Sequence, residues 1–259
     1  MKFTKMHRTG NDYIYVNGFE ETIENPVDFA IAYSDRHKGI GSDGLVMIMP
    51  SETCDFRMRM FNADGSESEM CGNASRCIGK FVYDKGLTTK TSVTLETLAG
   101  VKILDLVLDE NNTVKTVTVD MGEPIFDGKT IPTIFDEEKI IDKKVIFENG
   151  LEYNITAVSM GNPHAVIYQN NIADLNLPVI GPVIENASVF PRRTNTEFIE
   201  VVSADYIKMR VWERGSGETL ACGTGACAAV VAGVLNGKNN RKTTVELLGG
   251  ELTIEWKES

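Results

Sequence analysis

The sequence contains an internal duplication, and this feature constrains the fold more than any other. Residues 56–77 and 207–227 share one pattern: a run that alternates apolar and charged residues, a stretch rich in Gly and Ser, and a cysteine followed by glycine. The two cysteines, Cys71 and Cys222, lie 151 positions apart (222 − 71), and a Gly-Asn pair precedes each by 61 positions (71 − 10 and 222 − 161). We therefore expect two similar domains related by a pseudo-twofold axis, each with one thiol at the equivalent place.

The chain length suits this division. Its 259 residues can form two domains of roughly 120–130 residues, each large enough for a core of its own. The periodic pattern weakens over residues 122–149, where prolines and a charged run occur. We predict an N-terminal domain over residues 1–122 that carries Cys71, a C-terminal domain over residues 123–259 that carries Cys222, and an active site in the cleft between them.

Each half reads as β-rich with one enclosed helix, so the predicted fold class is α+β. Helices are expected at residues 26–36, 72–84 and 223–235; the last is apolar on every side, which is typical of a helix surrounded by strands. Alternation and turn residues predict strands at residues 2–6, 13–17, 43–48, 56–61, 92–97, 101–108 and 114–120, and at 153–159, 165–168, 197–202, 207–212, 244–248 and 251–256.

Composition excludes several classes of function. A net charge of −11 disfavours nucleic acid or an anionic membrane as a partner. The N-terminus has no apolar run typical of a signal peptide, and no segment reaches the ~20 apolar residues of a membrane span. The five cysteines are therefore expected to be thiols rather than disulfides, and the protein to be cytoplasmic.

A cysteine at the start of a helix is suited to acid–base chemistry. Free backbone N–H groups and the helix dipole stabilise a thiolate there, so we expect the pKa of both thiols to be lowered. Gly72 and Gly223 permit close approach of a ligand, and the same helix ends can bind a carboxylate. Two such thiols on opposite faces of one α-carbon would invert it by removing a proton from one side and delivering a proton to the other. This reaction requires neither a metal nor a prosthetic group.

The remaining cysteines and histidines support fewer hypotheses. Cys77, Cys227 and Cys54 are interpreted as structural. The cysteine spacings C-x5-C and C-x4-C and the scattered histidines do not match a zinc site. His164 is either structural or part of the repeated Gly-Asn element, and the pair Glu213 and Arg214 is either a surface charge pair or a contact to an amino-acid substrate. The asparagines taken singly are weak indications, because asparagine in loops usually forms turns.

Taken together, the motifs resemble those of diaminopimelate epimerases over essentially the whole chain. The matching segments are residues 5–7, 10–12, 39–44, 62–67, 71–73, 161–164, 194–195 and 213–225. The resemblance implies the diaminopimelate epimerase fold and a homodimer that interconverts L,L- and meso-2,6-diaminoheptanedioate, without a cofactor, in lysine and peptidoglycan precursor biosynthesis.

The resemblance also implies a role for each site residue. Cys71 and Cys222 would transfer the protons, and His164 and Glu213 would tune the pKa of the thiols. The substrate would be bound by Asn11, Asn62, Gly72, Asn73, Asn162, Asn195, Glu213, Arg214, Gly223 and Thr224.

Two departures and several rival functions remain. Arg8 and Thr9 stand where the family usually has Gly and a small apolar residue, which puts the backbone before Asn11 in doubt, and Ala74-Ser75 replaces a common Gly-Ala. A proline racemase or hydroxyproline epimerase usually has Gly-His after its first cysteine, where this chain has Gly72-Asn73. A phenazine-type isomerase would lack the cysteine pair. A non-catalytic amino-acid-binding protein would need neither thiol.

Overall fold

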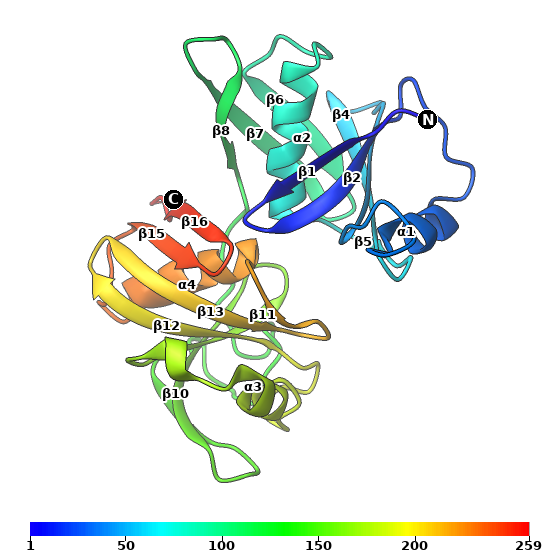
Figure 1. The fold of residues 1–259 in the computed structure, drawn as a ribbon. Coiled ribbons are helices and arrows are strands. Elements are labelled where there is room, and N and C mark those ends of the chain that lie inside the picture. Colours follow the sequence, from blue (N-terminus) through cyan, green and yellow to red (C-terminus); the bar gives the residue numbers. More distant parts are fainter. Residues whose placement is uncertain (259) are drawn as a thin grey trace. The chain divides into compact units, whose positions relative to one another are not determined.

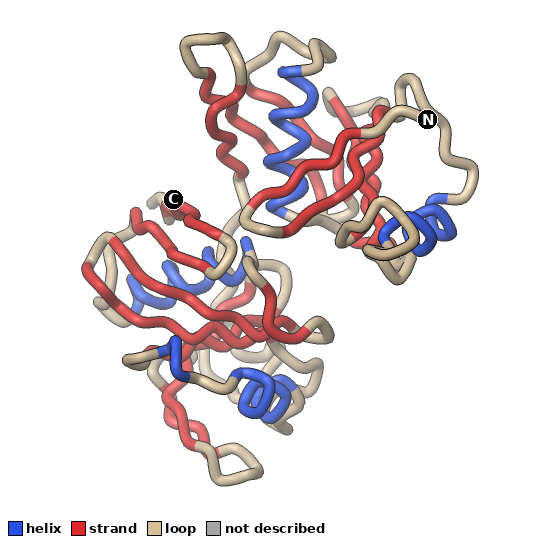
Figure 2. The backbone as a smooth tube through the Cα atoms, viewed as in Figure 1, coloured by secondary structure: helices blue, strands red, loops and turns tan. Residues whose placement is uncertain are grey.

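The computed structural model describes residues 1–258, which form two compact units, and the boundary between them along the chain lies between Met121 and Gly122. Each unit is a sheet that curls around one long helix, as the ribbon in Figure 1 and the backbone tube in Figure 2 show. The predicted α+β class, with a central helix in each of two similar β-rich halves, is confirmed.

The first unit begins with a hairpin, and most strands of its sheet precede helix α2 in the sequence. Its elements are β1 (Thr4–Arg8), β2 (Asn11–Asn17), α1 (Pro26–Ser34), β3 (Gly44–Met49), β4 (Phe56–Asn62), β5 (Glu67–Ser68), α2 (Gly72–Asp84), β6 (Ser92–Thr97), β7 (Gly100–Leu108) and β8 (Val114–Val119).

The second unit repeats this order with a different insertion. Its elements are β9 (Lys143–Ile146), β10 (Glu152–Ser159), β11 (Pro163–Tyr168), η1 (Ile172–Asp174), α3 (Leu177–Glu185), β12 (Asn195–Ser203), β13 (Tyr206–Glu213), β14 (Gly217–Thr219), α4 (Gly223–Leu235), β15 (Lys242–Leu247) and β16 (Gly250–Glu255).

The duplication is visible in the strand order. The first sheet runs β1-β2-β3-β4-β6-β7-β8, and the second, read from the other end, runs β9-β10-β11-β12-β13-β15-β16. Six strands correspond, β1 to β10 and so on through β7 to β16, with the same sequence of antiparallel and parallel pairings. The register is also kept: Ile14 lies opposite Leu45, and Ala165 opposite Thr196, which are the same positions plus 151.

The two central helices have the bounds that the sequence predicts, and they are buried for different reasons. Helix α2 is amphipathic and packs residues such as Ile78 and Val82 into the core of its sheet. Helix α4 is apolar on all sides, and residues 225–233 are buried without interruption because strands of the second sheet surround it. Cys77 and Cys227 are both buried, as expected of core residues.

The structure contains elements that the sequence did not indicate. Helix α3 carries Pro178 at its start and Pro182 inside it, and proline normally argues against a helix interior because it lacks an N–H donor. The short strands β5 and β14 each pair with only two or three residues of the preceding strand. Helix α1 begins at Pro26 with Asn25 as its N-cap, as predicted, but ends at Ser34, two residues before the expected end.

No helix within residues 1–258 is long and apolar enough to cross a membrane.

Candidate active site

Cys71 caps the N-terminus of α2 in the first unit and is partly buried. Its Sγ lies 3.5 Å from Oδ1 of Asn11, to which the thiol donates a hydrogen bond. The same oxygen accepts a bond of 3.5 Å from Nδ2 of Asn73, in the first turn of the helix. The thiol, the start of β2 and the helix N-terminus therefore converge on one point.

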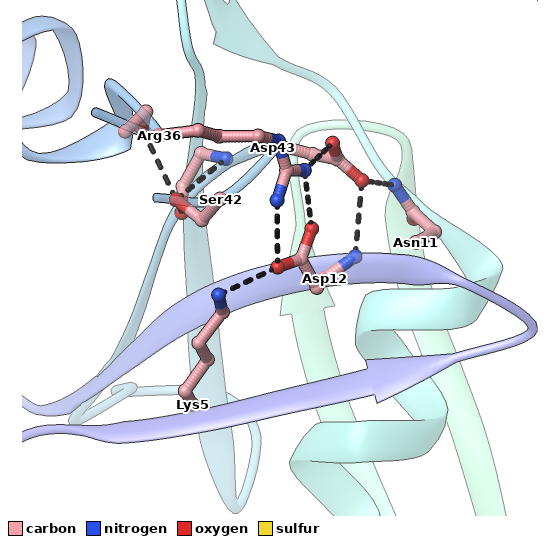
Figure 3. A network of polar contacts seen from close by, with 8 residues as sticks. Lys5, Asn11, Asp12, Arg36, Ser42 and Asp43 are labelled. Carbon is pink, nitrogen blue, oxygen red and sulfur yellow. Dashed lines mark hydrogen bonds and ion pairs between the residues drawn. The ribbon is translucent and has the colours of Figure 1, made fainter. Parts of the chain in front are cut away.

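A network of charged groups holds the side-chain amide of Asn11 in place (Figure 3). Oδ2 of Asp43 accepts hydrogen bonds from Nδ2 of Asn11 (2.8 Å) and from the backbone N–H of Asp12 (3.0 Å). Arg36 donates to both Asp12 (2.7 Å) and Asp43 (2.8 Å), and Lys5 pairs with Asp12 at 3.0 Å. Arg36 and Lys5 lower the pKa of the Asp12 carboxyl, although burial alone, the largest single influence, would raise it.

The turn between β1 and β2 shows how the chain accommodates its departure from the family pattern. Thr9 and Gly10 form a two-residue hairpin turn, and both have positive φ (53° and 83°). Thr9 is a β-branched residue in a conformation that favours glycine. Its hydroxyl donates to the carbonyl of Arg8 at 2.7 Å and lies 3.4 Å from Oδ1 of Asn73. The strained residue is thus linked to the first turn of α2.

Cys222 holds the equivalent position in the second unit, as the N-cap of α4, and is buried. Its Sγ accepts a hydrogen bond from the backbone N–H of Gly225 (3.3 Å), which is the interaction expected at a helix N-terminus. It also lies 3.4 Å from Oγ1 of Thr224. A Cβ added to Gly225 would lie 2.6 Å from Oε1 of Glu197 and 3.2 Å from Sγ of Cys222, so this helix residue has no room for a side chain.

The expectation of a lowered thiol pKa is wrong for Cys222. Burial raises its pKa well above the ordinary value, and the nearby carboxylates of Glu213 and Glu197 raise it further. The hydrogen bonds from Thr224 and Gly225 act in the opposite direction but are outweighed. The sequence argument considered the helix dipole but not the burial of the thiol beside two acids, and Cys222 therefore rests as a thiol.

Glu213 is the residue best placed to exchange a proton with this thiol. Burial raises the pKa of Glu213, while hydrogen bonds with Thr219 and Cys222 lower it in part. Thr219, on β14, donates to Oε1 of Glu213, so the short strand that the sequence did not predict holds the carboxylate in place.

His164 lies on β11 and is fully buried. Its Nδ1 is 2.7 Å from Oε1 of Glu197 on β12, and its Nε2 is 3.0 Å from Oδ1 of Asn162. Asn162 in turn donates from Nδ2 to Oγ1 of Thr224 at 3.3 Å. His164 is therefore connected to Cys222 through two polar side chains rather than directly.

The other predicted binding residues lie in three places. Asn195, at the start of β12, accepts a bond from the backbone N–H of Arg214 (2.9 Å) and donates to the carbonyl of Pro163 (2.8 Å). Arg214 is exposed and donates to the carbonyl of Arg192 at 3.0 Å. Asn62 is the last residue of β4, and it donates to Oγ of Ser66 at 3.0 Å rather than to the group around Cys71.

Gly72 and Gly223 are the first residues of α2 and α4. A Cβ added to Gly223 would meet no heavy atom within 4 Å, and one added to Gly72 would meet only the sulfur and methyl group of Met121 and one nitrogen of Arg76 at 3.4 Å or beyond. The space beside the start of α4 is thus open, and the space beside the start of α2 is bordered by Met121 and Arg76. Within residues 1–258, no group of three or more His, Cys, Asp and Glu side chains could hold a metal ion.

The residues of the site that were not predicted from the sequence include Asp43, Arg36 and Glu197. Asp43 lies in the segment 39–44 that matches the family pattern, but it received no role because its partner Asn11 is 32 positions away. Glu197 could have been found by aligning the two copies, since the equivalent residue of the first half is Val46 (197 − 151). A charged residue at a position that is apolar in the other copy is a signal for function.

Comparison with known proteins is consistent across the whole chain. A profile of the family described as diaminopimelate epimerase matches residues 3–126 and 156–259. The chain is 58% identical to a diaminopimelate epimerase of Methanococcus maripaludis over all of this chain and 93% of that protein, and 59% identical to one of Acetivibrio thermocellus over all of this chain and 92% of that protein.

Solved structures at lower identity share the fold. A hydroxyproline epimerase of Agrobacterium vitis superimposes with a TM-score of 0.66 at 13% identity, over 97% of this chain and 82% of that one. A phenazine biosynthesis protein of the PhzF family from Bacillus anthracis gives a TM-score of 0.66 at 18% identity, over 97% of this chain and 87% of that one. The whole-length identity, with a cysteine capping the central helix of each half, shows that the chain belongs to the diaminopimelate epimerase family.

Proposed function

We propose that this protein is a diaminopimelate epimerase that interconverts the L,L and meso isomers by two-base proton transfer between Cys71 and Cys222, without a cofactor. The observation that carries the proposal is the equivalence of the two thiols. Each belongs to the N-cap residue of the central helix of its half, at the same position of a duplicated topology, and each cysteine is followed by a glycine. Family membership supplies the substrate class.

In the proposed reaction the two thiols approach one α-carbon from opposite faces. One sulfur, as thiolate, takes the α-proton, and the electron pair left on the carbon is delocalised into the substrate carboxylate. Backbone N–H groups at the starts of α2 and α4 stabilise the negative charge that develops there. The other thiol then delivers its proton to the opposite face, so that the configuration is inverted and the two sulfurs exchange protonation states.

The raised pKa of Cys222 assigns this thiol a role in the first turnover. Because it keeps its proton at neutral pH, it is the donor in the first turnover from the resting enzyme. Cys71, whose S–H donates to Oδ1 of Asn11, must release that proton before it can act as the base. After the turnover Cys222 is a buried thiolate and must regain a proton. Before a second turnover in the same direction, Cys71 must release the abstracted proton to water. Glu213, whose pKa is raised by burial and which is hydrogen-bonded to the thiol, can take up a proton from water and pass it to Cys222.

Substrate binding follows the polar groups around each thiol. Asn11 and Asn73 in the first half, and Asn162 and Thr224 in the second, surround the helix ends and are proposed to hold the reacting amino-acid centre. Asn62, Asn195, Glu213 and Arg214 are proposed to complete the contacts to the substrate, with the exposed guanidinium of Arg214 as a partner for a carboxylate.

The experiment is an exchange assay. Reduced protein without added metal or pyridoxal phosphate is mixed with L,L-diaminopimelate in deuterium oxide and followed by NMR. Formation of the meso isomer with deuterium at one α-carbon is expected, and Cys71→Ala and Cys222→Ala should each abolish it. No exchange by folded, reduced protein would refute the proposal, as would activity toward proline or hydroxyproline alone. Binding of diaminopimelate without exchange would indicate a non-catalytic binding protein.

We also propose that the protein acts as a homodimer in the cytoplasm and binds neither nucleic acid nor membranes, as the family resemblance and the net charge of −11 suggest. Light scattering during size-exclusion chromatography should give twice the chain mass of 28.5 kDa. A monomer that retains full activity would contradict the dimer.

A further inference from the structure

Glu197 is a carboxylate buried in the middle of a protein sheet, and its environment is incomplete. The residue is 0% exposed on β12, and Oε1 lies 2.7 Å from Nδ1 of His164, which is itself 0% exposed. Oε2 has no hydrogen-bond partner among residues 1–258. Burying a carboxylate is unfavourable unless it is paired, so the residue must be held by its interaction with His164.

Both ring nitrogens of His164 face oxygen atoms. A carboxylate and an amide oxygen are both acceptors only. Nδ1 faces Oε1 of Glu197 and Nε2 faces Oδ1 of Asn162, so both nitrogens can donate when Glu197 is ionised. A ring that donates at both nitrogens carries a positive charge that would offset the charge of the carboxylate inside the sheet.

The pair also determines how Asn162 is oriented. With its oxygen held by His164, Asn162 presents Nδ2 as a donor to Thr224 (3.3 Å), whose hydroxyl lies 3.4 Å from Sγ of Cys222. A continuous series of polar contacts therefore runs from Glu197 to the thiol.

In the first half, the equivalent asparagine has the opposite orientation toward its thiol side. This residue, Asn11, is held directly by the carboxylate of Asp43, which binds the amide nitrogen, so that the amide oxygen faces Cys71 as an acceptor. At the positions equivalent to His164 and Glu197 (164 − 151 and 197 − 151) this half has Tyr13 and Val46, both buried in its core.

We propose that Glu197 is a positioning residue that keeps His164 doubly protonated and thereby makes Asn162 a hydrogen-bond donor on the Cys222 side of the site, opposite in sense to Asn11 on the Cys71 side. The inference rests on the proposed function, because it assigns to that reaction a chemical difference between its two halves. The two bases are then inequivalent by construction: Cys71 lies beside a carbonyl oxygen that accepts from its S–H, and Cys222 lies beside a hydroxyl and an N–H that can donate to its sulfur.

The first measurement concerns the resting protein and needs no substrate. Long-range ¹H–¹⁵N correlation spectra of ¹⁵N-labelled protein at pH 7 report which ring nitrogens of the three histidines carry hydrogen, and His164→Gln assigns the signal. We expect both nitrogens of His164 to be protonated. A neutral ring with hydrogen on one nitrogen only would overturn the inference, whatever the behaviour of any variant.

The second measurement compares Glu197→Gln with Glu200→Gln. The control removes the same charge from the same strand, at a partly buried residue whose carboxylate accepts a backbone hydrogen bond from Ile172. Glu197→Gln should leave His164 neutral and reduce kcat by about 10- to 100-fold, the range typical of losing a group that orients another functional side chain. KM should change by less than kcat, and Glu197→Asp should restore part of the loss.

The outcomes separate the inference from the proposed function. A wild-type protein that shows the doubly protonated His164 but no epimerisation would refute the proposed function and leave the Glu197 pairing intact. A wild-type protein that epimerises, with Glu197→Gln matching Glu200→Gln in kcat and in the His164 spectrum, would overturn the inference alone.

Discussion

Gly225→Ala should destabilise the second unit, although alanine is normally the better residue in a helix. Gly225 is the third residue of α4 and is buried. Its added Cβ would lie 2.6 Å from Oε1 of Glu197, well inside the distance at which a carbon and an oxygen touch, and 3.2 Å from Sγ of Cys222. Neither neighbour can retreat freely, because the carboxylate is bonded to His164 and the thiol caps the helix.

The magnitude follows from three contributions. Overpacking a core site costs about 1–3 kcal/mol. Displacing the Glu197 carboxylate weakens a hydrogen bond between charged groups, worth about 1.5–3 kcal/mol. The helix preference of alanine over glycine returns about 1 kcal/mol. The free energy of unfolding should therefore fall by about 1.5–5 kcal/mol, and the epimerase activity should fall with it.

Urea unfolding followed by tryptophan fluorescence is suited to this test, because the chain has two tryptophans and both, Trp212 and Trp256, lie in the second unit. Gly223→Ala is the matched stability control, since its Cβ would meet no heavy atom within 4 Å; its unfolding free energy should stay within about 0.5 kcal/mol of wild type. In a Glu197→Ala background, Gly225→Ala should cost much less. An equal cost in both backgrounds would refute the collision with Glu197 as its cause.

Three further predictions concern other parts of the chain. Asp43→Asn replaces an oxygen that accepts from Asn11 or Arg36 with an amide that cannot, and should raise KM for diaminopimelate at least tenfold; an unchanged KM in the exchange assay would contradict the role of this network. The folded-state pKa of Cys222 is raised, so the stability that the protonated thiol contributes is fully present below the unfolded thiol pKa of about 8.5 and is lost as the pH rises toward the folded value. The difference in unfolding free energy between wild type and Cys222→Ser, measured by urea unfolding from pH 7 to pH 10, should therefore narrow. A constant difference would count against the raised pKa. Asn25→Ala removes the side-chain acceptor for the backbone N–H of Asp28 and should lower the unfolding free energy by about 1 kcal/mol, as thermal unfolding would show; no change would mean that the cap adds nothing to α1.

The fold could be predicted from the sequence where local patterns and tertiary packing agree. Helices α2 and α4 have the expected bounds because a cysteine–glycine start and a Lys-Gly or Asn-Gly end mark them on both sides. Helix α3 could not be predicted, because Pro178 and Pro182 argue against a helix and only its packing beside the second sheet supports it. Trp212 shows that packing directly: a Cβ added to Gly181 of α3 would lie 2.2 Å from its ring.

The candidate site divides in the same way. Residues within one motif, such as Cys222 with Thr224 and Gly225, could be grouped from the sequence because a helix turn brings them together. The direction of the Cys222 pKa could not be inferred, since it depends on burial first and then on the charges of Glu213 and Glu197, the second of which comes from a strand that no local pattern connects with the thiol. The helix start alone would lower the pKa of the thiol, but burial within the sheet and the neighbouring acids raise it.

The differences between the two copies therefore carry as much information as their likeness. The shared features are a cysteine at the N-cap, a following glycine and an asparagine 60 positions before the cysteine (71 − 11 and 222 − 162), and they would provide the symmetric part of the proposed two-base reaction. The buried pair of His164 and Glu197, at positions that hold Tyr13 and Val46 in the first half, is costly to bury and has no counterpart there. The epimerisation is itself asymmetric, because each thiol meets the opposite configuration at the α-carbon. A duplicated fold can catalyse such a reaction only if the two copies diverge around the thiols. In this structure they diverge in the residues that hold Asn11 and Asn162.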